Sequence, residues 1–150
     1  MFGFEVKTFE ANHVTLAQTR DQERDFLVKL GHVEERLQAM SKNGPAWSIF
    51  KDGQWIASGG CLPIFPHVAD YWQVPSIHVE KHIISYGKFN RWLCNQIFET
   101  LPYTRLQTLT NIDTLHHRWM SFLNFQVEGI QRGYGLEHQD MYMWARLKDG

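Results

Sequence analysis

The chain has 150 residues, of which 43% are hydrophobic and 21% are charged, and its formal net charge at pH 7 is −1. A chain of this length is expected to form one domain, residues 1–150, with a core that needs no disulfides. The near-neutral charge and the lack of a basic run argue against a nucleic-acid partner. No apolar run reaches the ~18 residues of a membrane span, and residues 1–10 lack the apolar core of a signal peptide.

Cys61 and Cys94 are the only cysteines. They are too few for a disulfide framework, and their spacing does not suit a metal site. Both lie among apolar residues. We therefore expect two buried thiols in a protein made in a reducing cytoplasm.

The N-terminal part is predicted to contain a strand followed by helices. Residues 4–8 alternate as a strand does, and a short helix is predicted over residues 11–18, with Asn12 as a candidate cap. A charged cluster at residues 20–24 leads into an apolar segment that Gly31 ends. Beyond it, apolar residues recur at helical spacing and predict a second helix that ends near residue 44; they are Val33, Leu37 and Met40.

A hairpin is predicted over residues 46–64. The Asp52-Gly53 dipeptide lies between two apolar runs, which is a strong turn signal. Gly59 and Gly60 within the second run predict a bulge or a close backbone approach.

The central stretch is predicted to be a strand at residues 69–74, a loop that opens at His78, and an amphipathic helix from about Ser85. Apolar residues repeat along that helix at a spacing of three to four; they are Phe89, Trp92, Leu93, Ile97 and Leu101. A strand that leads to a helix N-terminus can hold an anionic group, because free backbone N–H groups point at it.

The C-terminal part is predicted to contain a strand at residues 103–110, a helix around residues 115–123, and two strands at residues 125–131 and 139–147. Asn124 fits the left-handed conformation in which many helices end. The expected order is β, α, α, β, β, β, α, β, α, β, β. This order predicts an α/β (α+β) fold with a mixed sheet covered by helices on both faces.

This order of elements resembles the GNAT acyltransferase fold, whose central sheet is mixed and mostly antiparallel. Residues 119–129 (WMSFLNFQVEG) also resemble the C-terminal helix and strand of that family, which commonly read aromatic-Tyr-x-x-Leu-Gly-Phe and then Glu-Gly. The likeness is closer to a group of phage-encoded GNAT-like proteins that includes an internal virion protein of short-tailed phages. The counterparts of that group's motifs are His82, Trp92, Leu101-Pro102, residues 103–110, Asn111 and residues 118–125.

The GNAT resemblance implies acetyl-CoA as the cofactor and a pyrophosphate loop of the form Gln/Arg-x-x-Gly-x-Gly/Ala. In such a loop, glycines allow backbone N–H groups to reach phosphate oxygens. The matching residues run from His82 to Gly87, and only Gly87 fits the pattern. The cofactor-binding residues implied by the resemblance are His82, Ser85, Tyr86, Gly87 and Asn111.

The resemblance also implies a tyrosine that protonates the departing thiolate, a general-acid role. Met120 occupies the matching position and cannot donate a proton. Tyr103, Tyr134 and Tyr142 are the candidates to replace it, and no local pattern selects one of them. Asp70, near the start of the central strand, is a weak candidate for the general base, and its alternative is a solvated carboxylate at the strand end.

The eight histidines do not predict a metal site. His116 and His117 are adjacent in a predicted helix and point about 100° apart. His78 and His82 are four residues apart, but no third ligand accompanies them. We expect these side chains to be exposed or hydrogen-bonded.

Two functional hypotheses follow from the resemblance. In the first, which we favour, the chain is a virion- or infection-associated structural component of a phage, with a degenerate acyl-CoA site. Its partners would be other phage virion proteins or further copies of itself, in the host cytoplasm and in the virion. In the second, it is an active acyl-CoA-dependent N-acetyltransferase acting on a protein or a small amine. A binding module on the same scaffold is a third alternative, since fold does not fix function.

Overall fold

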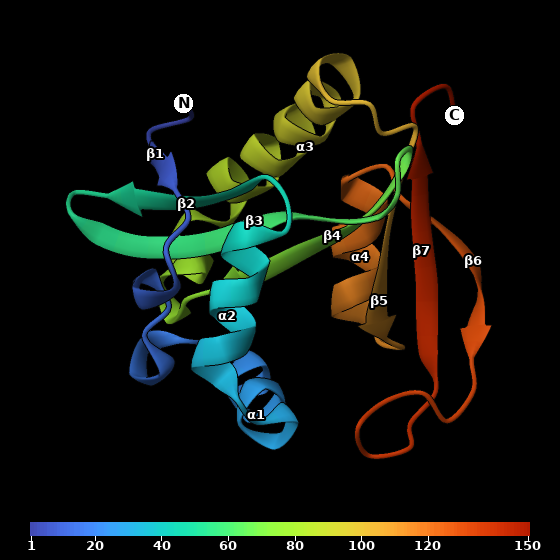
Figure 1. The fold of residues 1–150 in the computed structure, drawn as a ribbon, viewed down its shortest axis with the longest axis horizontal. Coiled ribbons are helices and arrows are strands. Elements are labelled where there is room, and N and C mark those ends of the chain that lie inside the picture. Colours follow the sequence, from blue (N-terminus) through green and yellow to red (C-terminus); the bar gives the residue numbers. More distant parts are fainter. The chain divides into compact units, whose positions relative to one another are not determined.

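The computed structural model describes residues 1–150 and contains seven strands and four α-helices (Figure 1). The order of strands and helices matches the predicted one, but the first α-helix is formed by residues 21–30, where no helix was predicted, and not by residues 11–18. The strands are β1 (Glu5–Thr8), β2 (Ala46–Lys51), β3 (Gln54–Phe65), β4 (Val68–Pro75), β5 (Arg105–Asn111), β6 (Gln126–Gln131) and β7 (Met141–Leu147). The α-helices are α1 (Asp21–Leu30), α2 (Val33–Lys42), α3 (Ile83–Thr100) and α4 (Thr114–Phe122). Three short 3₁₀ helices are η1 (Ala11–His13), η2 (Leu16–Gln18) and η3 (Ile77–His82).

The strands form one sheet in the order β1-β2-β3-β4-β5-β7-β6. The β4–β5 pair is parallel, and its register joins Val68–Asp70 to Arg105–Gln107. The pairs β1–β2, β2–β3, β5–β7 and β6–β7 are antiparallel. The predicted mixed, mostly antiparallel sheet is therefore confirmed.

The chain divides into two compact units, which we describe one at a time. The first comprises residues 1–62 and 71–86. A core cluster of Leu27, Trp55 and Val74 lies within it. Half-buried residues pack against this cluster; they are Val14, Leu16, Val33, Phe50 and Trp72. This unit thus joins α1, the segment before it and the first strands through one apolar cluster.

The hairpin of β2 and β3 has the predicted turn, because Asp52 and Gly53 both have positive φ, 50° and 79°. Gly59 and Gly60 in β3 lie close to a neighbouring backbone, which is one of the two arrangements predicted for them; the other was a bulge. A Cβ on Gly60 would lie 2.7 Å from the Pro45 carbonyl oxygen and 2.7 Å from the Trp72 indole nitrogen. The register irregularity of this hairpin is at Ile49 and Phe50 instead.

The prediction of one short helix over residues 11–18 is wrong in detail, since η1 and η2 are separate 3₁₀ turns. Glu10, not Asn12, precedes the first turn. It forms a reciprocal cap with His13, whose ring nitrogen Nδ1 accepts from the Glu10 backbone N–H at 3.1 Å. The His13 side chain thus pairs with the Glu10 backbone N–H, a donor for which the short helix η1 provides no carbonyl partner.

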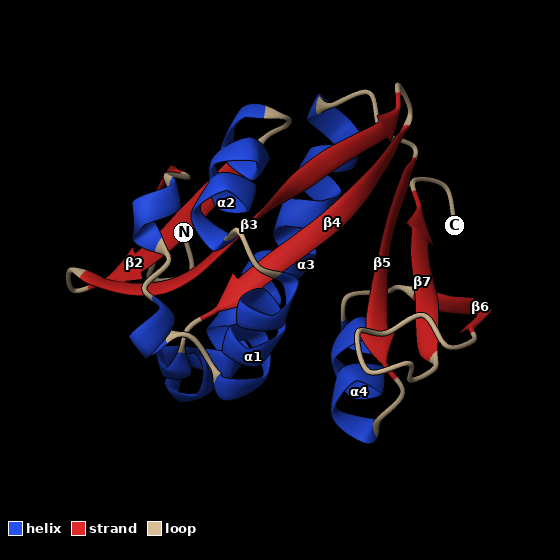
Figure 2. Cartoon of the chain, turned by 60° about the horizontal axis from the view of Figure 1, so that its bottom comes forward, coloured by secondary structure: helices blue, strands red, loops and turns tan.

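The second unit comprises residues 63–70 and 87–150. In it β7 lies between β5 and β6, as Figure 2 shows. Trp144 of β7 is buried, and its indole N–H donates to the Thr110 hydroxyl of β5 at 2.8 Å. Asn124 follows α4 with φ 67°, the left-handed conformation predicted for it. This residue turns the chain from α4 toward β6.

Both cysteines are fully buried and neither forms a disulfide, as predicted. No helix of the structure has the length and apolar character required to span a membrane.

Candidate functional site

The segment expected to be a phosphate-binding loop is helical. Ser76 begins it: its hydroxyl accepts from the His78 backbone N–H at 3.1 Å and donates to the Trp55 carbonyl at 3.2 Å. The 3₁₀ helix η3 then runs directly into α3, because Ile83 has helical dihedral angles of −59° and −38°. The predicted loop from His78 to Ser85 is therefore wrong. Ser85 is no N-cap, since it lies within the first turn of α3.

Tyr86 points its hydroxyl away from solvent. Its side chain is 4% exposed, and the hydroxyl donates to Oε1 of Gln73 in β4 at 3.2 Å. A buried phenol that already has a partner is costly to redirect toward a ligand. Tyr86 thus acts as a link between the start of α3 and β4.

Gly87 has a packing role in α3. A Cβ built there would lie 2.8 Å from Cε1 of Phe122 in α4, closer than real Cβ contacts allow. The Arg91 guanidinium lies 4.9 Å from the centre of the same Phe122 ring. The missing side chain of Gly87 is therefore explained by Phe122, without a phosphate.

Three isoleucines are among the solvent-facing residues at this place, next to the exposed Glu80 and Lys81 of η3. Ile77 is 48% exposed, Ile83 46% and Ile84 70%. His82, beside them, has its ring edge-on to Phe4, with 6.2 Å between ring centres. A phosphate-binding loop presents N–H groups and small residues, whereas this surface presents isoleucines.

The other predicted site residues lie in the second unit and are spread along it. Asp70 is half-buried and pairs with Gln107 in the parallel register. Asn111 is four residues further along β5, about 13 Å at the usual strand rise. Its Oδ1 accepts from Gln139 at 3.2 Å. Tyr134, in the loop after β6, is exposed. Asp70, the candidate base, lies beside Gln107 and is therefore far from Asn111 at the other end of β5.

Met120 is 4% exposed, so the position of the family's acidic tyrosine is filled by a buried thioether. On the same helix, Asp113 caps α4 by accepting from the His116 backbone N–H at 2.7 Å. Burial acts to raise the pKa of Asp113, but the hydrogen bonds from the His116 backbone and ring outweigh it, and the pKa is lowered. His116 is thereby committed to the cap.

Sequence patterns gave no sign of the ion pair that joins β5 to β6. The Arg105 guanidinium donates to both carboxylate oxygens of Glu128, at 2.8 and 2.6 Å. This bidentate bond lowers the pKa of Glu128 and raises that of Arg105. Since β7 separates the two strands, the pairing cannot be found from residue spacing.

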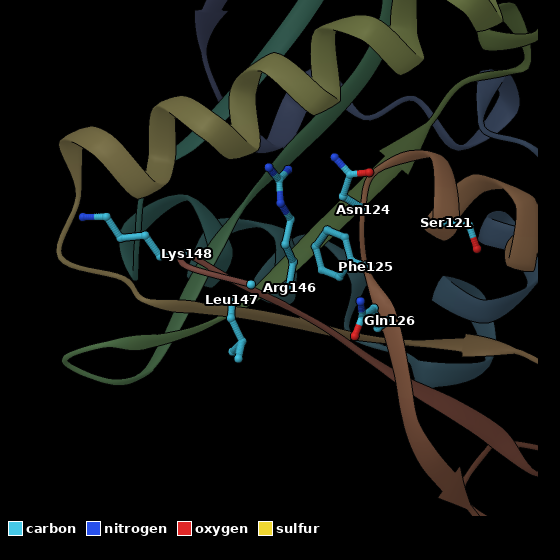
Figure 3. A pocket seen from close by; sticks show the side chains of 8 residues that line it. Ser121, Asn124, Phe125, Gln126, Arg146, Leu147 and Lys148 are labelled. Carbon is cyan, nitrogen blue, oxygen red and sulfur yellow. The ribbon is translucent and has the colours of Figure 1, made fainter.

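An open hollow of about 420 Å³ lies at the end of β7, lined by residues that include Asn124, Gln126, Arg146 and Lys148. In Figure 3, Arg146 extends toward α3, and Lys148 points away from Asn124 and Gln126. The Arg146 guanidinium donates to the Leu123 carbonyl at 3.2 Å and to Asn95, and it lies 5.5 Å from the centre of the Phe98 ring. Arg146 is therefore engaged in holding α3, α4 and β7 together.

No cluster of three or more His, Cys, Asp or Glu side chains is arranged to hold a metal ion.

No protein-family profile matches the sequence, and no curated protein matches it. Solved structures do match the fold. A GNAT-family acetyltransferase from Bacillus anthracis has a TM-score of 0.77 at 12% identity, covering 99% of this chain and 96% of that one. Ard1 from Thermoplasma volcanium has a TM-score of 0.75 at 8% identity, covering 97% of each chain.

A third structure, a GNAT-family acetyltransferase from Elizabethkingia anophelis, was solved with acetyl-CoA bound. Its TM-score is 0.67 at 12% identity, and the match covers 97% of this chain and 98% of that one. Likeness at such identities establishes the fold. The chain has the mixed α/β fold of the GNAT acetyltransferases.

Proposed function

We propose that this chain keeps the GNAT fold without efficient acyl transfer, and that it serves as a structural or accessory component. The observation that carries this proposal is the start of α3, where the expected phosphate loop is replaced by a continuous helical segment with exposed isoleucines.

The helical segment weakens phosphate binding for a backbone reason. A helix N-terminus attracts anions because its first N–H groups have no partner. Here η3 precedes α3 without a break. Carbonyl groups of η3 therefore lie three and four residues before the first N–H groups of α3, the spacing at which helical hydrogen bonds form.

The side chains weaken it further. A pyrophosphate at this place would lose water against the apolar side chains of Ile83 and Ile84, which offer it no hydrogen-bond donor. The cationic groups next to them are those of Lys81 and His82, in the last turn of η3. The buried Met120 adds an independent argument, since it cannot supply the proton that a thiolate leaving group needs.

The resemblance to phage-encoded GNAT-like proteins supplies the setting for this proposal. The chain would be made in the host cytoplasm and would bind other virion proteins or further copies of itself. The exposed isoleucines of η3 and α3 support such a role, because apolar side chains gathered on a surface favour protein contacts. Immunoblots of gradient-purified particles of the encoding phage test it; particles without the chain contradict the virion role.

A second candidate function is acyl-CoA-dependent N-acetyl transfer to a protein or a small amine. The likeness to a structure solved with acetyl-CoA favours it. In that case acetyl-CoA would bind at the start of α3, and its pyrophosphate would lie beside Ile84.

Calorimetric titration with acetyl-CoA separates the two candidates, using Ile84→Glu and the matched control Ile84→Gln. Ile84 is 70% exposed, so both variants should fold. We expect no saturable heat at millimolar acetyl-CoA. Micromolar binding that Ile84→Glu weakens at least tenfold and Ile84→Gln leaves unchanged would establish the cofactor site, and turnover of ~1 per second or faster would overturn the proposal.

A further inference from the structure

A groove with an apolar floor lies between α2 and the segment of η1 and η2. Its volume is about 590 Å³, within the range of small-molecule sites. All of its lining residues belong to the first unit. None of them belongs to the start of α3, so the groove is separate from the candidate cofactor site.

The floor of the groove is the outer side of the first unit's core. Phe9 and Leu37 are buried, and Val14, Leu16 and Val33 are half-buried. The last three also pack against the cluster of Leu27, Trp55 and Val74. Collapse of the groove would require them to leave that cluster, so the floor is preformed and can cover an apolar ligand.

The rim of the groove carries negative charge. Glu10 and Glu34 line it, and no lysine or arginine does. The neutral amide nitrogen of Gln38 donates to Oε1 of Glu34 at 3.4 Å. Both carboxylates lie on exposed residues, so a cation in solvent can reach them, and that of Glu10 also contacts Nε2 of His13.

Glu10 is the outer end of a chain of polar groups that runs into the core. Nε2 of His13 lies 3.3 Å from the Glu10 carboxylate. Nδ1 of the same ring accepts from the Glu10 backbone N–H at 3.1 Å and lies 2.7 Å from the Ser48 hydroxyl. Ser48 and Ser58 hydroxyls are 2.6 Å apart, and the Trp55 indole N–H donates to Ser58 at 3.0 Å.

We propose that this groove binds a small organic cation, an ammonium group carried on an apolar aromatic or alkyl body. The apolar body would cover the floor, and the ammonium group would pair with Glu10 and Glu34. Hydrogen bonds between charged partners are stronger than neutral ones, and the preset position of Glu10 lowers the entropic cost of binding. This inference does not depend on whether the chain binds an acyl-CoA.

The test is a titration with tryptamine, with its neutral isostere tryptophol, and with indolepropionate as the anionic counterpart. The readout is NMR shifts of the methyl groups of Val14, Leu16, Val33 and Leu37. We expect tryptamine to bind and to shift these methyl groups, and tryptophol to bind about tenfold more weakly, the loss of roughly one charged hydrogen bond. Indolepropionate should not bind.

Three variants locate the charge. Glu10→Gln and Glu34→Gln should each weaken tryptamine binding several-fold. Glu35→Gln should not, since Glu35 is exposed on α2 and does not line the groove. Thermal unfolding confirms that each variant is folded. Equal affinity for tryptamine and tryptophol, no binding of tryptamine at millimolar concentration, or shifts confined to other methyl groups would overturn the proposal.

Discussion

At the scale of single residues, Gly87 separates a packing role from a ligand role. As part of a motif, this glycine resembles the last residue of a phosphate loop. In the structure it is the residue of α3 against which Phe122 packs. The absence of a Cβ suits both close packing and close approach of a phosphate, so the residue type alone does not distinguish the two roles. A substitution at Gly87 distinguishes them.

We expect Gly87→Val to destabilise the protein by about 1–3 kcal/mol, the usual cost of overpacking. The valine Cβ would lie 2.8 Å from Cε1 of Phe122. Valine has a higher helix propensity than glycine, but the gain is small because its side chain is β-branched. Urea unfolding measures the free energy.

The matched control for this substitution is a double-mutant cycle with Phe122→Ala. In the Phe122→Ala background the cost of Gly87→Val should fall by about 1 kcal/mol or more, because contacting residues couple by this amount. An unchanged cost in that background would show that Phe122 does not explain Gly87.

At the scale of elements, the ion pair of Arg105 and Glu128 joins strands that are not neighbours in the sheet. It predicts a specific loss of stability in acid. The bond to Arg105 lowers the pKa of Glu128 in the folded protein, so the unfolded chain binds a proton more readily. The stabilisation is therefore present above the unfolded pKa of ~4.3 and disappears as the pH falls through the lower folded pKa.

We expect Glu128→Gln to lower the free energy of unfolding at pH 7 by about 0.5–1 kcal/mol. The loss is small because the Glu128 side chain is 42% exposed and solvent screens its charge. The difference from the parent protein should shrink as the pH falls below the unfolded pKa and vanish below the lowered folded pKa of Glu128, where the glutamate is protonated in both states. Asp113 also has a lowered pKa, but it is present in both proteins and cancels from the comparison. A difference that persists in acid would contradict the electrostatic origin.

The elements also show what the sequence could and could not predict. Local signals worked: Asp52-Gly53 formed the turn, and Asn124 adopted the left-handed conformation. The start of α3 was missed because Ile83 and Ile84 break the amphipathic pattern, their apolar side chains facing solvent. The sequence does not indicate how far apart the site candidates lie in the folded chain; they are Asp70, Asn111 and Tyr134. Their separation depends on strand register, which residue spacing does not encode.

At the scale of the whole molecule, the two compact units raise the question of whether the chain unfolds in one step. A length of 150 residues fits one cooperative domain. Each unit contains one fully buried cysteine, Cys61 in the first and Cys94 in the second. A buried thiol reacts only when its surroundings open, so each cysteine reports on its own unit.

We expect both thiols to resist alkylation in the native protein and to become reactive over the same range of urea concentration. Pulsed alkylation with iodoacetamide, followed by mass spectrometry of the peptides that contain Cys61 and Cys94, gives the reactive fraction of each. Coincident midpoints are the result required of a single cooperative domain, because one transition then exposes both cores. If Cys94 reacted at a urea concentration that leaves Cys61 protected, the second unit would open alone, and the single-domain prediction would be wrong. A control in which the alkylation time is doubled shows whether the labelling follows equilibrium or the rate of opening.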